Sequence, residues 1–423
     1  MMMKNSKVYP WVVVGLLWIV ALLNYMDRQM LSTMQEAMGH DIVELQNAEA
    51  FGFLMSVFLW IYAVMSPVSG VIGDRLNRKW LIVGSLFVWS SVTLAMGFAQ
   101  SYNQILVLRA VMGISEALYM PAALSLIADY HQGKSCSLAV GIHMTGLYCG
   151  QAVGGFGATV AAAFSWHTAF LGFGLVGVIY SLILIAFLHD KGRGREAASP
   201  AQLAAQQAAQ QSANQPKESI WKAFPILFSS LAFGVILFYF AVLSLPGWAT
   251  KNWLPTLFAN SLDIPMSQAG PMSTITIAFS SFLGVIIGGV LSDKWVKVNL
   301  RGRVYTSAIG LSLTIPSLVL LGTSHDIVGV VSAGLLFGIG YGMFDTNNMP
   351  ILCQFVSSKY RATAYGIMNM TGVVFGAIVT QLLGKLKDGG MDLGVSFACM
   401  GAVVAVAVIL QLLFLKPTSD NME

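Results

Sequence analysis

The sequence predicts an all-α polytopic membrane protein with twelve transmembrane helices. The composition points to this class, because 56% of the 423 residues are hydrophobic and only 10% are charged. A soluble domain carries about 25% charged residues. Apolar segments also recur along the whole chain, and each has about the 20 residues that a hydrocarbon core roughly 30 Å thick requires. We therefore expect a lipid bilayer to surround most of the protein.

The apolar segments form a regular series. The first segment is long and lacks an Ala-x-Ala-like cleavage site, so we expect it to be a membrane span rather than a signal peptide. The expected spans are residues 11–31, 50–72, 80–100, 103–128, 137–162, 167–188, 226–256, 268–291, 303–321, 326–350, 363–384 and 393–415.

The loops between the spans predict the orientation of the protein. Lys and Arg residues near helix ends stay on the cytoplasmic side of a membrane. Most of the chain's 23 Lys and Arg residues lie in the terminal segments and in the loops after the second, fourth, sixth, eighth and tenth spans. We therefore expect both termini in the cytoplasm and the protein in the cell (inner) membrane.

A low-complexity tract separates the spans into two sets of six. Residues 197–215 consist mainly of Ala and Gln, a composition that can bury little apolar surface and suits a cytosolic linker. The sequence therefore predicts an N-terminal six-helix bundle over residues 1–190, a cytoplasmic linker over 191–222 and a C-terminal six-helix bundle over 223–423.

A Gly-x-x-x-Asp block follows the second span of each set. The first block is Gly70-x3-Asp74-Arg75-x2-Arg78, and the second contains Asp293. The glycines of such a block allow two helices to approach closely. Two such blocks in a twelve-helix chain resemble the major facilitator superfamily, whose two halves surround a central midplane site. The resemblance implies a 6+6 fold and a gating role for these residues, whereas a basic anchor that only sets topology is the simpler alternative.

Four charged residues lie inside the first six predicted spans: Asp27, Arg28, Arg109 and Glu116. A charge at this depth costs roughly 2.5 to 3.5 kcal/mol, so such residues usually face a bundle interior and mark a substrate or proton path. Arg109 and Glu116 are seven residues apart, which places them on one helical face about 10 Å apart along the axis. This pattern predicts a transporter.

The four charges also suggest how a proton and an anion could be coupled. With both carboxylates ionised the group is neutral, and an entering anion would make it negative. We expect desolvation to favour a neutral Glu116, whereas Arg28 and Arg109 would keep Asp27 ionised. Our hypothesis is that a carboxylate substrate displaces one arginine from its acidic partner and that a carboxylate then takes up a proton. The alternative is a pair of salt bridges that only hold helices together.

These residues resemble the anion:cation symporter branch of the superfamily, which takes up sugar acids and other organic anions with H⁺ or Na⁺. The resemblance rests on Asn24-Tyr25-x-Asp27-Arg28, on Tyr62, on Arg109-x6-Glu116 and on Trp253-Leu254-Pro255-Thr256. It implies proton coupling by Asp27 and Glu116, and substrate binding by Arg28, Arg109, Tyr62 and Tyr25.

A competing branch shares several of these marks. Asp27-Arg28-Gln29 and the segments 74–78 and 125–130 are similar to bacterial Spinster-like transporters, which are linked to lipid-like amphiphiles. The run at 253–256 and the polar residues of the second half favour the organic-anion branch. A sensor derived from a transporter, which binds without flux, is a further alternative.

The second half contributes Asn347, Asn348 and Asn369, whose amides could hydrogen-bond sugar hydroxyls without adding positive charge. Asp345 precedes them and is a candidate for a second protonation site, for a partner of a basic group or for a residue at one mouth of the pathway.

His143 and Gln151 share one face of the fifth span, since they are eight residues apart. They are candidates for substrate contact, with interhelical hydrogen bonds as the alternative.

No motif of a soluble enzyme is present, and the four cysteines show no metal-ligand spacing. We therefore expect no enzyme, no metal, no cofactor and no nucleic-acid partner. The sequence predicts a monomeric carrier that imports a small monovalent organic anion, such as a hexuronate or aldonate, with H⁺, and Na⁺ is the alternative coupling ion.

Overall fold

In a computed structural model, the chain is described over residues 8–131, 135–190, 225–357 and 360–417. At residues 70, 71, 73–75, 137 and 362 only the backbone is described. Every regular element in these ranges is a helix. The predicted linker, residues 191–222, lies outside the described residues, so the domain boundaries remain a prediction.

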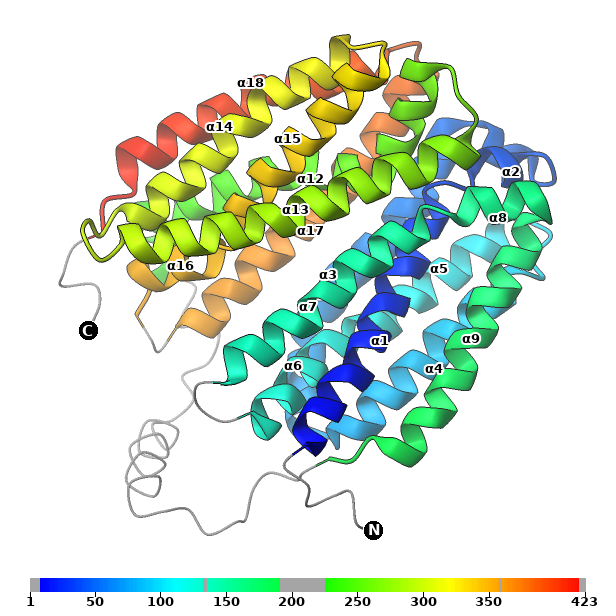
Figure 1. The fold of residues 1–423 in the computed structure, drawn as a ribbon, viewed down its shortest axis with the longest axis horizontal. Helices are drawn as coiled ribbons and strands as arrows, with labels where there is room; N and C mark the ends of the chain where they lie inside the picture. The colour runs from blue at the N-terminus through cyan, green and yellow to red at the C-terminus, as the bar shows by residue number, and fades with distance from the viewer. Residues whose placement is uncertain (1–7, 132–134, 191–224, 358–359, 418–423) are drawn as a thin grey trace.

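The helices before residue 190 pack as one group, which we call the first group (Figure 1). Its closest contacts join α1 with α7 and α4 with α9. The group consists of α1 (Tyr9–Leu31), α2 (Gln35–Gly39), the 3₁₀ helix η2 (Val43–Gln46), α3 (Ala48–Arg75), α4 (Arg78–Met96), α5 (Tyr102–Ala117), α6 (Tyr119–Tyr130), α7 (Cys136–Gly154), α8 (Gly157–Ala163) and α9 (Trp166–Phe187).

The helices after residue 230 form the second group, in which α15 packs closely on α13 and α14. The group consists of α12 (Leu231–Leu262), α13 (Met266–Trp295), α14 (Gly302–Thr323), α15 (Ile327–Asp345), α16 (Asn348–Phe355), α17 (Arg361–Asp388) and α18 (Leu393–Phe414).

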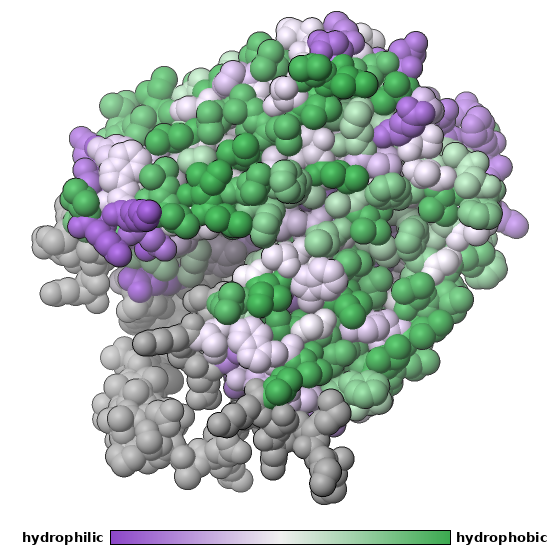
Figure 2. Space-filling view, in the orientation of Figure 1, coloured by the Kyte–Doolittle hydropathy of each residue, from purple (hydrophilic) through white to green (hydrophobic). Residues whose placement is uncertain are grey.

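Eleven helical segments of the described residues are long and apolar enough to cross a membrane. The expected span 137–162 is not among them, and in that region the chain forms α7 and α8, which are separated at residues 155–156. Figure 2 shows apolar side chains over the flank of the molecule and hydrophilic ones gathered at its ends. This distribution is that of a protein whose flank faces lipid.

Two of the expected spans are interrupted at corresponding places in the two groups. The span at 103–128 is divided into α5 and α6 at Leu118, and the span at 326–350 into α15 and α16 at residues 346–347. A proline lies just beyond each break, Pro121 and Pro350. Proline donates no backbone hydrogen bond, and its ring clashes with the carbonyl four residues earlier, here at Ala117 and Thr346. Each break therefore lies within the turn that its proline destabilises.

The two groups meet at the end of the molecule opposite the chain termini (Figure 1). Here the Asp388 carboxylate on α17 accepts hydrogen bonds from the Ala48 and Glu49 amides of α3, at 2.9 and 2.7 Å. Nearby, Gln29 of α1 donates to the Lys251 carbonyl of α12 at 2.9 Å. We call this end the closed end. Glycines allow the close approach, since a Cβ at Gly52 would lie 2.9 Å from the Thr380 carbonyl oxygen.

Candidate functional site

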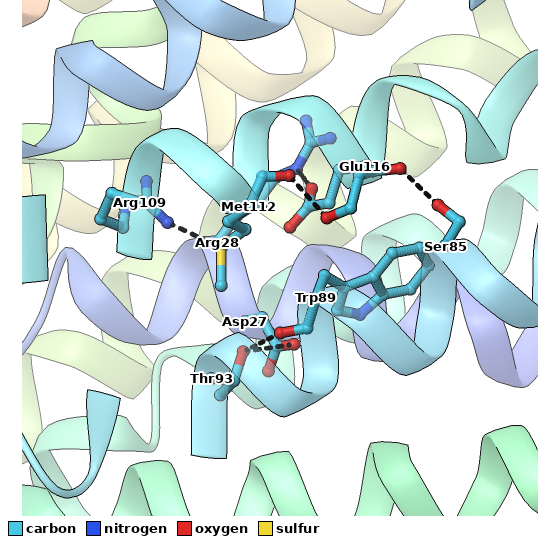
Figure 3. Close-up of polar contacts among 9 residues, drawn as sticks. Asp27, Arg28, Ser85, Trp89, Thr93, Arg109, Met112 and Glu116 are labelled. Carbon is cyan, nitrogen blue, oxygen red and sulfur yellow. Dashed lines mark hydrogen bonds and ion pairs between the residues drawn. The ribbon is translucent and has the colours of Figure 1, made fainter. Parts of the chain in front are cut away.

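An ion pair between α1 and α5 forms the centre of the candidate site (Figure 3). The Arg28 Nε donates to Glu116 Oε2 at 2.5 Å, and the two side chains are 15% and 0% exposed. In the sequence, Arg28 is the neighbour of Asp27, and Arg109 shares a helical face with Glu116. In the folded chain, however, Arg28 pairs with Glu116. Glu116 Oε1 is buried without a hydrogen-bond partner in the described residues.

Aromatic rings surround the guanidinium of Arg28. The carbon Cζ lies 4.7 Å from the ring centre of Phe58, 4.9 Å from that of Tyr62 and 5.2 Å from that of Tyr25. Such contacts hold a cation by the negative face of the ring and exclude water from its sides. The structure thus places the predicted residues Tyr25 and Tyr62 around Arg28.

Arg109 is the second buried cation of the first group. Its side chain is almost fully buried, and its Cζ lies 4.7 Å from the same Phe58 ring. Its only hydrogen bond in the described residues runs from Nη1 to the sulfur of Met112 at 3.2 Å, and Nε has no partner. No described carboxylate lies within 4.0 Å of it. Arg109 is therefore a desolvated cation without an ion-pair partner.

Asp27 points away from Arg28, toward α4. Its Oδ2 accepts a hydrogen bond from Thr93 Oγ1 at 3.2 Å, and Oδ1 is buried without a partner in the described residues. Neighbouring residues on an α-helix point about 100° apart, so Asp27 and Arg28 cannot face the same partner. No described basic group lies within 4.0 Å of Asp27, and the expectation that the two arginines keep it ionised remains a prediction.

The second group supplies two charged residues, Asp345 and Lys251, of which the sequence analysis found only Asp345. Asp345, the last residue of α15, is exposed although it lies in the middle of the span 327–355. Lys251 on α12 was missed. Its Nζ lies 4.7 Å from the ring centre of Trp248 and 5.7 Å from that of Tyr341. The signal was present, because Lys251 is the only charged residue between Lys222 and Asp263.

Amides lie next to Asp345 at the break between α15 and α16. Asn348 donates to Asp345 Oδ1 at 3.5 Å, and Asn347 donates to the Met343 carbonyl at 2.8 Å. The side-chain oxygens of both asparagines are buried without a partner in the described residues. Asn369 is half-buried on α17. Two buried acceptors are therefore available to hydroxyl donors.

His143 and Gln151 are both buried on α7. The ring centre of His143 lies 6.1 Å from that of Tyr119 on α6, and neither ring nitrogen has a hydrogen-bond partner in the described residues. His143 thus lies inside the first group and contacts a helix of that group, and its predicted substrate contact remains a prediction, as does that of Gln151.

The predicted gating residues lie near the end that holds the chain termini. Arg78 forms an ion pair with Asp129, and its amide donates to Asp190 at 2.9 Å. In the second group Arg303 lies 3.6 Å from Asp293. The side chains of Gly70, Asp74 and Arg75 lie outside the described residues, so their gating role stays a prediction.

Comparison with known proteins places these features in context. The sequence profile of the Major Facilitator Superfamily matches residues 17–381. The chain is 23% identical to the probable galactarate/D-glucarate transporter GudP of Bacillus subtilis (strain 168), over 96% of this chain and 92% of that protein. It is 27% identical to the sphingosine-1-phosphate transporter SPNS2 of Mus musculus, over 86% and 68%.

The fold resembles that of a bacterial homologue of the human lysosomal transporter Spinster, solved in an inward-facing and occupied conformation. The TM-score is 0.77 at 18% identity, and the match covers 99% of both chains.

Proposed function

The chain belongs to the major facilitator superfamily and is a multi-pass membrane transporter rather than an enzyme, and on this premise we propose that it imports a small organic anion, a sugar acid, together with protons. Import would proceed by alternating access of the two groups of helices around the site between them. The name of the Bacillus relative supports a sugar acid as the cargo.

The observation that carries the proposal is the ion pair of Arg28 with Glu116. A carboxylate substrate that binds Arg28 competes with Glu116 for the same guanidinium. The Glu116 side chain lies fully buried, and its Oε1 has no hydrogen-bond partner among the described residues. A carboxyl group in that environment is more stable when protonated. Binding of the anion and uptake of a proton would therefore promote each other.

The neighbouring groups fit the same cargo. Arg109 is a buried cation without an ion-pair partner, so a substrate carboxylate would relieve its desolvation cost. The free oxygens of Asn347 and Asn348 could accept hydrogen bonds from hydroxyl groups. Asp27, which accepts a hydrogen bond from Thr93, would be a further proton acceptor.

The contacts between the groups suggest which state the structure represents. They lie at the closed end, opposite the chain termini. Most Lys and Arg residues lie in the terminal segments and in the loops after the second, fourth, sixth, eighth and tenth spans. They favour a cytoplasmic position for the end that holds the chain termini. In this proposal the protein lies in the inner membrane and the structure is closed toward the outside.

Substitution of Glu116 tests the coupling. We expect Glu116→Gln to abolish accumulation of galactarate or galactonate against a gradient in proteoliposomes, because the amide cannot take up the proton. Exchange of labelled for unlabelled substrate should persist, since exchange requires no net proton movement. Glu36→Gln is the matched control, because Glu36 is exposed on α2, outside the site. Unchanged pH-driven accumulation in the Glu116 variant would contradict the proposal. If the wild-type protein binds substrate but transports none, it is a sensor.

A second candidate function follows from the similarity to the mouse sphingosine-1-phosphate transporter. In this alternative the aromatic rings around Arg28 would bind a lipid-like amphiphile. Thermal-shift measurements on the purified protein with galactarate, galactonate and lysophospholipids separate the two functions. Stabilisation by the sugar acids is the expected result, and stabilisation by the lysophospholipids alone would favour the alternative.

A further inference from the structure

Lys251 is a cation of the second group whose ammonium has no ion-pair partner. No carboxylate of the described residues lies within 4.0 Å of its Nζ. The ammonium instead lies against the rings of Trp248 and Tyr341. The side chain of Lys251 is half-buried, so part of it is open to solvent. A cation in this setting is available to an anionic ligand.

The backbone places Lys251 at the same depth as the ion pair of the first group. Gln29, the residue after Arg28 on α1, donates to the carbonyl of Lys251 on α12. The charge of Arg28 acts on the Lys251 ammonium, as does that of Asp345. The Tyr25 phenol lies within electrostatic reach of Arg28, Glu116 and Asp345 together. Arg28 and Lys251 therefore lie beside the same contact between α1 and α12.

The two groups of helices carry the same arrangement of charges. Each has a cation on its first long helix, Arg28 on α1 and Lys251 on α12. Each also has a carboxylate beside a proline-induced helix break, Glu116 and Asp345. The arrangements differ in one respect: Arg28 is bonded to Glu116 at 2.5 Å, whereas Lys251 has no carboxylate within ion-pair distance.

We propose that Lys251 binds a second anionic group of the substrate, so that the carrier prefers sugar acids with two carboxylates over those with one. This inference rests on the proposed function and replaces the monovalent cargo that the sequence predicts. One carboxylate would bind the arginines of the first group and the other would bind Lys251, with the hydroxyls between them at the asparagines. A substrate that spans the two groups would also hold them together during the transport cycle.

The test compares two sugar acids that differ only at one end. Galactarate and galactonate share their carbon chain and stereochemistry, and only galactarate has the second carboxylate. Isothermal titration calorimetry of the purified protein should show galactarate binding about tenfold to a hundredfold more tightly, the range for a hydrogen bond to a charged group. Lys251→Gln should reduce this ratio toward one, and Lys251→Arg should preserve most of it. Lys385→Gln, at an exposed lysine of α17, is the matched control and should leave the ratio unchanged.

The possible results separate this inference from the proposed function. Equal affinity of the wild-type protein for the two acids would overturn the inference and leave the proposed function intact. If Lys251→Gln weakens the binding of both acids by the same factor, the inference is also overturned and the proposed function again stays intact. If neither acid binds the wild-type protein, the proposed function fails and this inference fails with it.

Discussion

Arg28 and Arg109 both contact the Phe58 ring, but they differ in what holds their charge. Arg28 has a carboxylate partner at 2.5 Å, whereas the one hydrogen-bond acceptor of Arg109 among the described residues is the sulfur of Met112 at 3.2 Å. A buried cation without a carboxylate is costly unless a ligand supplies one. At the residue scale, Arg109 is therefore the group whose charge gains most from an entering anion.

Replacement of Arg109 by lysine tests this role. We expect Arg109→Lys to weaken galactonate binding about tenfold or more, because an ammonium cannot form the two parallel hydrogen bonds that a guanidinium gives a carboxylate. Calorimetry on the purified protein measures the change. Arg301→Lys is a suitable control, since Arg301 bonds the Leu412 carbonyl outside the site. Unaltered galactonate binding by the Arg109 variant would show that Arg109 does not bind the carboxylate.

The sequence identifies buried charges more readily than their partners. Asp27, Arg28, Arg109 and Glu116 stand out because a charge inside an apolar segment is rare. Which of these residues meet depends on how each helix is rotated about its axis relative to its neighbours. The apolar pattern of a single sequence does not specify this rotation. The pairing of Arg28 with Glu116 therefore emerges only from the structure. Lys251 is a different case, since the same criterion applied to its span would have found it.

At the scale of elements, the site depends on two helix breaks next to prolines, and the apolar pattern does not reveal these breaks. The breaks after α5 and α15 place Glu116 and Asp345 at helix ends, where the helical hydrogen bonding is interrupted. The apolar pattern predicts one span in each place, because hydropathy averaged over about 20 residues does not detect an interruption of one or two residues. The prolines, Pro121 and Pro350, were the available signal.

Removal of one proline tests the importance of the break. Pro121→Ala should allow α5 and α6 to join, which would rotate Glu116 relative to Arg28. We expect the initial rate of uptake in proteoliposomes to fall about tenfold, equivalent to roughly 1.4 kcal/mol. Pro316→Ala is the control, because Pro316 lies inside the uninterrupted helix α14. A normal rate in the Pro121 variant would show that the break does not position Glu116.

At the scale of the whole molecule, the two groups of helices meet through the packing of α3 on α17 and of α7 and α8 on α13, together with a few polar contacts. The Asp388 carboxylate and the Gln29 amide make the hydrogen bonds named above, and both bond to backbone groups of the opposite group. Contacts of this kind can form and break without unfolding either group, which alternating access requires. The all-α membrane architecture was predictable from composition and span length, because the bilayer imposes both.

The central claim is that anion binding and proton uptake occur together at Glu116. The most direct test adds galactarate to the purified protein in weakly buffered solution near neutral pH and measures the protons taken up. The account predicts proton uptake on binding by the wild-type protein and less uptake by Glu116→Gln. Binding by the wild-type protein without any proton uptake would contradict it.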